Sequence, residues 1–153
     1  MTESPVEPVE TNADADQFEL PIHLRWGDMD SLAHVNNVQV ARLFEEARVR
    51  AFAEWFGERR EGISMLVARQ DIEYHSPLAY TQEPVRILVR ISRIGRSSFQ
   101  WGYTLVDPNG VTCAIAQTSM VVIDRTTGRP TPIPDRIRAI LESHHGAPVN
   151  FRR

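Results

Sequence analysis

Asp28-Met29-Asp30-Ser31-Leu32-Ala33-His34-Val35-Asn36-Asn37 is the stretch that decides the fold, together with the amphipathic run that follows it. Apolar residues recur in that run at intervals of four, three, four and four, which is the spacing of one helical face. They are Val40, Phe44, Ala47, Ala51 and Trp55. Asn36 or Asn37 is suited to cap the start of a helix, and Gly57 is suited to end it. The pattern therefore predicts a polar loop leading into a long amphipathic helix.

Strand-like segments lie on both sides of this helix. Residues 20–26 alternate before it and end at Gly27. Four further runs follow it. Their expected inner faces are Leu66, Ala68, Gln70, Ile72 and Tyr74; Val85, Ile87, Val89 and Ile91; Phe99, Trp101, Tyr103 and Leu105; and the nearly continuous apolar run 111–123. The last run should lie inside the sheet, because both of its faces are apolar.

The connections between these segments favour an antiparallel sheet. Residues 95–97 and 107–110 are short enough for hairpins, and residues 133–141 are typical of a short final helix. Five strands need an apolar cover, and the long helix is the one segment of sufficient length. The sequence thus predicts an α+β fold, with a long central helix packed in a curled five-stranded antiparallel sheet.

Composition favours one soluble domain. The chain has 153 residues, of which 42% are hydrophobic. Residues 1–17 are acidic and poor in large apolar side chains, so we expect a disordered tail before a single domain at 18–153. There is no run long enough to span a membrane and no signal peptide pattern, so a cytoplasmic protein is expected. The single cysteine, Cys113, excludes an intrachain disulfide.

The charge pattern does not indicate a nucleic-acid partner. The net charge is −3, but six of the 20 acidic residues lie in residues 1–19, leaving fourteen acids against 17 bases in the remainder. All of these bases are arginine, a residue suited to bidentate phosphate binding. They are scattered rather than clustered, and genomic base composition explains the lack of lysine better than a binding function.

Two motifs carry a family resemblance. Trp26-Gly27-Asp28-Met29-Asp30, followed by His34-Val35-Asn36-Asn37, resembles the hotdog-fold acyl-CoA thioesterases of the 4-hydroxybenzoyl-CoA thioesterase-like family. Glu45-Glu46-Ala47-Arg48 matches the long-chain acyl-CoA thioesterase members as well. The likeness runs from about Ile22 to Ile123. It implies the hotdog fold and hydrolysis of acyl-CoA thioesters, with no metal and no redox cofactor.

The resemblance also implies particular site residues. Asp30 aligns with the catalytic carboxylate, and Asn36 and Asn37 align with the helix start whose backbone N–H polarises the thioester carbonyl. Arg96 is the local candidate for contact with coenzyme A phosphates. Val40 stands where many members carry a tyrosine that lines the acyl pocket. Active sites of the family lie at dimer interfaces, which implies a homodimer or a dimer of dimers.

Several residues have structural alternatives. An aspartate before a helix is often only a turn or capping residue, which applies to Asp30. Asp28 is expected on the opposite face of a strand end, so we assign it a structural role. His34 can orient Asp30, contact substrate or fill the loop. Cys113 is expected to be an inert buried thiol, and the remaining histidines lack the spacing of a metal site.

Hydrolysis of a fatty or aromatic acyl-CoA thioester is the function that the sequence favours. Asp30 would act as nucleophile or as general base, and the sequence leaves both routes open. One alternative is a non-catalytic hotdog protein that binds acyl-CoA. The other is an acyl-ACP thioesterase, which would use the same chemistry on a protein carrier.

Overall fold

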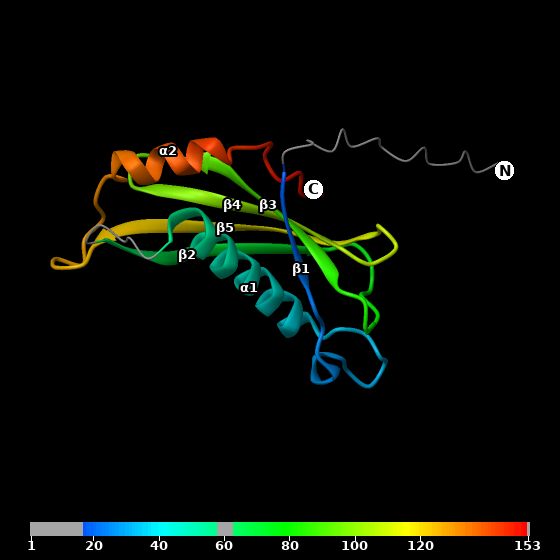
Figure 1. The fold of residues 1–153 in the computed structure, drawn as a ribbon. Coiled ribbons are helices and arrows are strands. Elements are labelled where there is room, and N and C mark those ends of the chain that lie inside the picture. Colours follow the sequence, from blue (N-terminus) through cyan, green and yellow to red (C-terminus); the bar gives the residue numbers. More distant parts are fainter. Residues whose placement is uncertain (1–16, 58–62, 153) are drawn as a thin grey trace.

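The molecule is a curled antiparallel sheet with a long helix against its concave face (Figure 1). The computed structural model describes residues 17–57 and 63–152. The elements are β1 (Phe18–Ile22), a 3₁₀ turn (Trp26–Asp28), α1 (Asn37–Phe56), β2 (Ile63–Tyr74), β3 (Val85–Ile94), β4 (Ser98–Val106), β5 (Thr112–Asp124) and α2 (Asp135–Ser143). The predicted tail lies outside the described residues, apart from Gln17.

The described strands form one five-stranded sheet in the order β1-β3-β4-β5-β2, with every neighbouring pair antiparallel. The interior position expected for residues 111–123 is confirmed, because β5 lies between β4 and β2. Both predicted hairpins are present. Gly95 N–H donates to Ser98 O at 2.7 Å, and Gly110 closes the second turn with a φ of 84° that favours glycine.

The core lies between α1 and the sheet, as the helical stripe predicts. Val40, Phe44, Ala47 and Ala51 are buried on the helix, and Trp55 is half-buried. The apolar faces predicted for β3 and β4 are each at most 1% exposed. Burial of such side chains is the main stabilising contribution to a fold of this kind. The predicted α+β architecture is therefore confirmed.

The ends of α1 also follow the sequence. Asn36 is the N-cap, and its side-chain oxygen accepts a hydrogen bond from Val38 N–H at 2.9 Å. Gly57 ends the helix with a φ of 61°. The helix therefore begins directly after the polar loop, with its N-terminus beside that loop (Figure 1).

Two predicted boundaries are wrong. The first strand ends at Ile22 rather than Trp26, because residues 26–28 form a 3₁₀ turn that the Asp28 side chain closes. The final helix begins at Asp135 rather than Ile133. Pro134 is its N-cap, and Ile133 N–H donates to Arg96 O at 2.9 Å instead of entering the helix.

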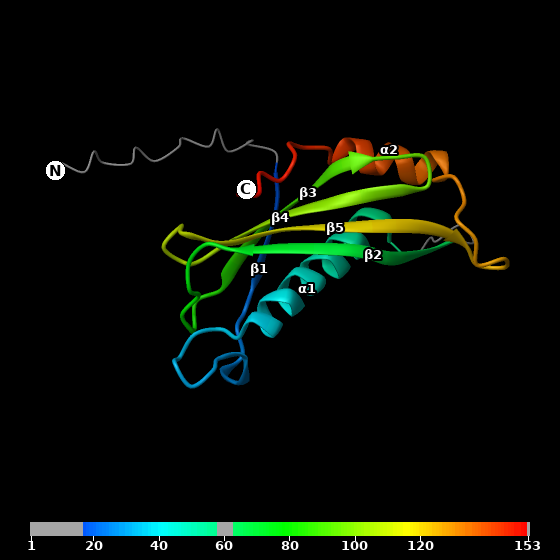
Figure 2. The same cartoon turned by 180° about the vertical axis from the view of Figure 1, so that it is seen from behind.

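The predicted inner face of residues 66–74 is also wrong. β2 is an outer strand, and a bulge between Val67 and Arg69 interrupts the alternation of its side chains. Leu66 is 53% exposed, and every residue from 66 to 70 is exposed. Figure 2, the view from behind, shows β2 along the free side of the sheet. None of the helices in the described ranges is long and apolar enough to cross a membrane.

Candidate active site

The loop before α1 is held by a buried carboxylate. Asp28 has no exposed surface, and its Oδ1 accepts hydrogen bonds from Arg25 Nε and Nη2 at 3.1 and 3.0 Å. Its Oδ2 accepts from Arg25 N–H and from Arg42 Nη2 at 2.8 and 2.9 Å. Burial by itself raises the pKa of Asp28, but the hydrogen bonds from Arg25 and the charge of Arg42 outweigh it, so the pKa lies below its usual value.

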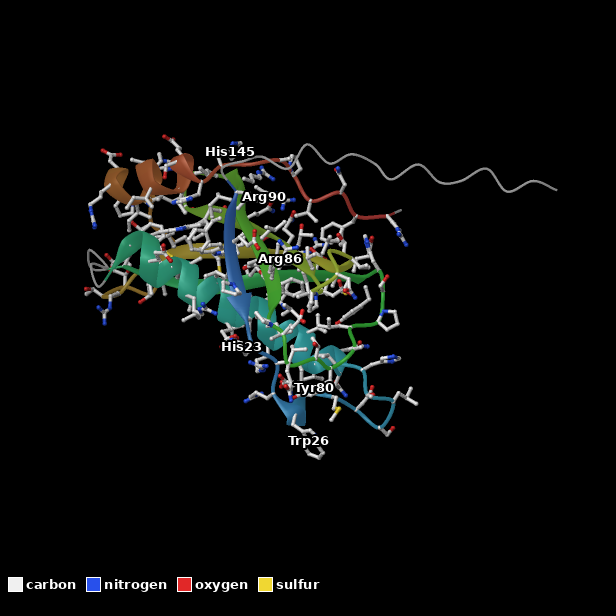
Figure 3. The ribbon with its side chains drawn as sticks, turned by 45° about the vertical axis from the view of Figure 1, so that its right-hand side comes forward. His23, Trp26, Tyr80, Arg86, Arg90 and His145 are labelled. Atoms are coloured by element: carbon white, nitrogen blue, oxygen red, sulfur yellow. The ribbon has the colours of Figure 1, made fainter. Side chains whose placement is uncertain are left out.

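A second set of contacts pins the loop to the segment between β2 and β3. Val35 N–H donates to Leu78 O at 2.7 Å, and Tyr80 N–H donates to Ala33 O at 3.1 Å. Ala33 has a φ of 57°, a left-handed conformation that a residue with a side chain rarely adopts. Figure 3 shows Tyr80 close to the loop and Trp26 at its outer end. The loop is thus fixed on both sides.

Asp30 lies inside this fixed loop with one oxygen held. Its Oδ1 accepts from the backbone N–H groups of Leu32 and His34, at 2.9 and 3.3 Å. Its backbone N–H donates to His34 O at 2.7 Å. Among the described residues no hydrogen bond reaches Oδ2, and Asp30 is exposed. One carboxylate oxygen therefore orients the group, and the other has no hydrogen-bond partner among the described residues.

The N-terminus of α1 supplies a hydrogen-bond donor beside the loop. Asn37 is the first helical residue, and within residues 17–57 and 63–152 its backbone N–H has no acceptor. Free N–H groups at a helix start carry partial positive charge and favour a bound anion or oxyanion. Asn36, by contrast, uses its side chain to cap the helix.

These groups meet in one cavity of about 320 Å³. Asp30, His34, Asn37 and Val40 all line it, so the structure brings together four of the six site residues expected from the sequence. The apolar wall also includes Val35, Leu78, Leu105 and Ala114. A carboxylate and a helix start beside an apolar wall are groups that can act in acyl transfer.

The other two expected residues do not line this cavity. Asn36 is the helix cap. Arg96 is exposed in the turn between β3 and β4, at the end of the sheet near α2, where its carbonyl accepts from Ile133 N–H and from Arg138 Nη2. The cavity lies at the opposite end, where β2 and β4 finish.

Four polar cavity residues were not predicted from the sequence: Tyr74, His75, Ser76 and Cys113. Tyr74 and His75 lie at the end of β2, and Cys113 lies at the start of β5 beside them, with its carbonyl accepting from His75 N–H at 2.8 Å. Burial and the nearby Asp107 charge raise the pKa of the Cys113 thiol, so it is protonated at neutral pH. The polar run at residues 73–76, at a strand end, was the signal available in the sequence.

His75 is itself oriented by an acid. Its Nε2 lies 2.7 Å from Glu73 Oε1, and Glu73 Oε2 accepts a hydrogen bond from Arg152 N–H at 2.8 Å. In the described part of the chain, no three metal-binding side chains lie close enough to hold an ion.

Comparison with known proteins identifies the family. The family model of the thioesterase-like superfamily matches residues 24–141, which include the loop, α1 and the whole of β2 to β5. The chain therefore belongs to the thioesterase-like superfamily. This confirms the enzyme class predicted from the sequence, a thioester hydrolase with the hotdog fold.

Individual relatives agree with this assignment. A 1,4-dihydroxy-2-naphthoyl-CoA hydrolase from Thermosynechococcus vestitus is 28% identical over 125 residues, covering 78% of this chain and 85% of that protein. A predicted thioesterase from Bacillus stearothermophilus is 31% identical with a TM-score of 0.77, covering 87% of this chain and 99% of that one. A thioesterase from Thermus thermophilus, solved in complex with coenzyme A and Zn, is 31% identical with a TM-score of 0.72, covering 85% and 95%.

Proposed function

We propose that this protein hydrolyses acyl-CoA thioesters, with Asp30 as the catalytic carboxylate. The observation that carries the proposal is the convergence of Asp30, His34 and Asn37 on one cavity at the N-terminus of α1. The coenzyme A bound to the Thermus thioesterase and the activity named for the Thermosynechococcus relative support coenzyme A as the carrier.

In this mechanism the helix start binds the thioester carbonyl oxygen. The Asn37 N–H donates to that oxygen and stabilises the negative charge that develops on it. One such donor contributes roughly 10²–10³ in rate. The acyl group lies against the apolar wall that contains Val40, Leu78 and Leu105.

Asp30 acts through its free oxygen, Oδ2, either as the nucleophile or as the general base. In one route Oδ2 attacks the carbonyl carbon, the C–S bond breaks, the coenzyme A thiolate takes a proton, and water hydrolyses the resulting anhydride. In the other route Oδ2 takes a proton from a water that attacks the carbonyl carbon directly, the C–S bond then breaks, and the proton passes from Asp30 to the coenzyme A thiolate. His34 orients Asp30 in both routes, because its backbone N–H holds Oδ1.

The active unit is proposed to be a homodimer formed through β2. Within the described sheet the outer edge of β2 has no strand beside it, and residues 66–70 are exposed there. Two copies related by a twofold axis would pair their β2 strands antiparallel and bury Leu66 and Val67. This pairing sets the start of β2 in one copy beside the cavity at the end of β2 in the other.

The same pairing would bring Arg96 of one copy toward the active-site cavity of the second copy. The β3–β4 turn lies at the end of the sheet where β2 starts, because Val121 pairs with both Leu66 and Ser98. Arg96 of one copy therefore lies at the end of the sheet that faces the cavity of the second copy, where a guanidinium can bind coenzyme A phosphates. Assembly of two such dimers into a tetramer is compatible with this arrangement.

A thiol-release assay over a panel of acyl-CoA chain lengths and aryl-CoAs tests the proposed activity. Release of free coenzyme A from at least one member is expected, and matched acyl-ACP substrates should react more slowly. A protein that binds these thioesters without releasing thiol would be a non-catalytic binding protein. Faster release from acyl-ACP would assign the protein carrier instead.

The β2 dimer is tested with a charge on its edge. Val67→Lys should convert the dimer to a monomer in light-scattering measurements, because it places charges across a paired edge. Val111→Lys is the matched control, since Val111 is similarly exposed at 45% but lies in the turn before β5. A Val67→Lys protein that stays dimeric would exclude this interface.

A further inference from the structure

Arginines gather at the end of the sheet where β3 and β5 end and β4 begins. Two segments form this surface, residues 93–98 and 121–138, and they lie together because Ser98 pairs with Val121 and Ile133 N–H donates to Arg96 O at 2.9 Å. We name this surface the arginine end. Its basic residues are Arg93, Arg96, Arg125, Arg129, Arg136 and Arg138. Six arginines against two aspartates, Asp124 and Asp135, give the two segments a net charge of +4.

The described part of the chain does little to neutralise this charge. Four of these arginines are exposed, and no ion pair reaches them from residues 17–57 or 63–152: Arg93, Arg96, Arg125 and Arg129. The Asp124 carboxylate is engaged elsewhere, since its Oδ1 accepts from the N–H groups of Thr126 and Thr127 at 2.8 Å each. A surface of this kind attracts a partner that carries several negative charges.

An acidic segment of matching charge is present in the same chain. Residues 1–16 contain five acidic residues and no lysine, arginine or histidine. The acidic residues are Glu3, Glu7, Glu10, Asp14 and Asp16. This segment precedes β1 and lies outside the described residues. Its five negative charges are close in number to the net charge of the arginine end.

The start of β1, where this segment joins the fold, lies near the arginine end. The ring of Phe18 packs edge-on against His144, with centroids 6.3 Å apart, and His144 directly follows α2 (Figure 1). Arg136 lies at the other end of α2, eight residues earlier, which is about 12 Å along a helix. Phe18 also pairs with Val89, and Arg93 is four residues further along β3, or about 13 Å.

These distances are within reach of the acidic segment. Sixteen residues span at most about 50 Å, and the seven residues 10–16 alone span at most about 23 Å. The carboxylates of Glu10, Asp14 and Asp16 can therefore reach the arginine end, and those of Glu3 and Glu7 have a longer range. Because the segment is tethered, its effective concentration at this surface is on the order of millimolar.

We propose that residues 1–16 dock on the arginine end of their own chain and compete there with ligands that carry phosphate groups. Exposed ion pairs are individually weak, but several on one tethered segment act together. Charge attraction of this kind requires no regular secondary structure. The contact goes beyond the proposed hydrolysis and does not depend on it. Its one consequence for catalysis, weaker binding of coenzyme A phosphates at Arg96, rests on the proposed function.

Nitroxide relaxation measurements on the full chain test the contact directly. The label is attached through Ser4→Cys, because the native Cys113 is buried. At low salt the label should abolish the amide signals of residues 95–98, and these signals should return in about 0.5 M salt, where charges are strongly screened. The matched control carries the same label on a neutral segment of equal length, with Glu3→Gln, Glu7→Gln, Glu10→Gln, Asp14→Asn and Asp16→Asn. Equal signals in the acidic and the neutral proteins would overturn the proposal.

Isothermal titration with inorganic tripolyphosphate tests the competition. The neutral-segment protein should bind this polyanion roughly tenfold more tightly than the wild type at low salt. Arg93→Gln combined with Arg129→Gln should remove the gain. Arg86→Gln should leave it unchanged, since Arg86 lies at the other end of β3 and pairs with Glu19.

The titration also separates other occupants of this surface. Equal affinity in the acidic and neutral proteins, or no binding to either, would overturn the competition. Equal tight binding, with unaltered signals for residues 95–98, would assign the arginine end to an external polyanion instead. None of these measurements uses thiol release, so failure of the proposed hydrolysis would leave their outcomes unchanged.

Discussion

The Asp28 carboxylate accepts a hydrogen bond from Nη2 of Arg42 at 2.9 Å, and this contact joins the loop before α1 to the helix itself. Arg42 stands one turn into the helix, whereas Asp30, only two residues after Asp28, lies in the candidate active site. Two neighbouring carboxylates thus have different surroundings: Asp28 is buried with both oxygens paired, and Asp30 is exposed with one free oxygen among the described residues.

Asp28→Asn should therefore cost stability more than turnover. The amide retains the shape but loses the charge that pairs with Arg25 and Arg42, at a cost of about 2 kcal/mol. For a domain of this size this lowers the melting temperature by roughly 4–8 °C. Differential scanning calorimetry measures it. A variant that melts like the wild type would show that the network does not stabilise the loop.

The same network predicts an acid-labile loop. The pKa of Asp28 is lowered on folding, so its contribution to stability is present above the usual pKa of 3.8 and is lost as the pH falls through the lower folded value. Asp28→Asn should therefore show a weaker loss of stability than the wild type below about pH 4. Acid unfolding of the two proteins is measured side by side. An equally steep loss of stability in both below about pH 4 would contradict this.

His144 predicts a second pH dependence, nearer neutrality. Its ring stacks on Trp55 with centroids 3.7 Å apart, and burial lowers its pKa against the opposing charge of Glu54. Because the unfolded chain binds the proton more readily, stability is full above the usual pKa of 6.5 and falls as the pH drops through the folded value.

His144→Phe keeps the stacking surface and removes this proton site. The melting temperature of the variant should fall less than that of the wild type between about pH 7 and pH 5. His145→Phe is the control, since His145 is exposed next to it, at the end of the molecule opposite Trp26 (Figure 3). If the melting temperatures of His144→Phe and the wild type depend on pH in the same way, His144 is not the group that causes this pH dependence.

Arg96→Ala should affect binding rather than chemistry. A guanidinium on a coenzyme A phosphate contributes equally to the ground state and the transition state, so KM should rise while kcat changes little. Arg86→Ala is the control, because Arg86 pairs with Glu19 across β1 and β3, at the side of the sheet away from β2. An unchanged KM in Arg96→Ala would remove this residue from the site.

The fold could be predicted where burial is one-sided and the pattern is regular. The stripe on α1 and the alternating faces of β3 and β4 are buried as expected, because each meets the core on one face. The same reasoning failed for β2. An outer strand with a bulge has no continuous buried face, so the alternation from Leu66 onward carried no information about the core.

Some residues of the candidate site could be predicted from the sequence and others could not. Asp30, His34 and Asn37 lie in one continuous stretch of the chain, so their proximity could be inferred from the sequence. Tyr74 and Cys113 reach the same cavity from β2 and β5, and only the register of the sheet brings them together. The burial of Arg48 could not be predicted, because arginine within an amphipathic helix is usually solvated.

Turnover of Asp30→Asn, compared with Asp28→Asn on the same acyl-CoA, is the measurement that tests the proposed function most directly. The amide that replaces the Asp30 carboxylate keeps an oxygen to accept from Leu32 and His34, but it can neither attack the carbonyl nor take a proton. The proposal predicts a fall in kcat of roughly 10²–10⁴ for Asp30→Asn, with acyl-CoA affinity and melting temperature near the wild type. Full turnover in Asp30→Asn, with activity lost instead in Asp28→Asn or His34→Ala, would contradict it.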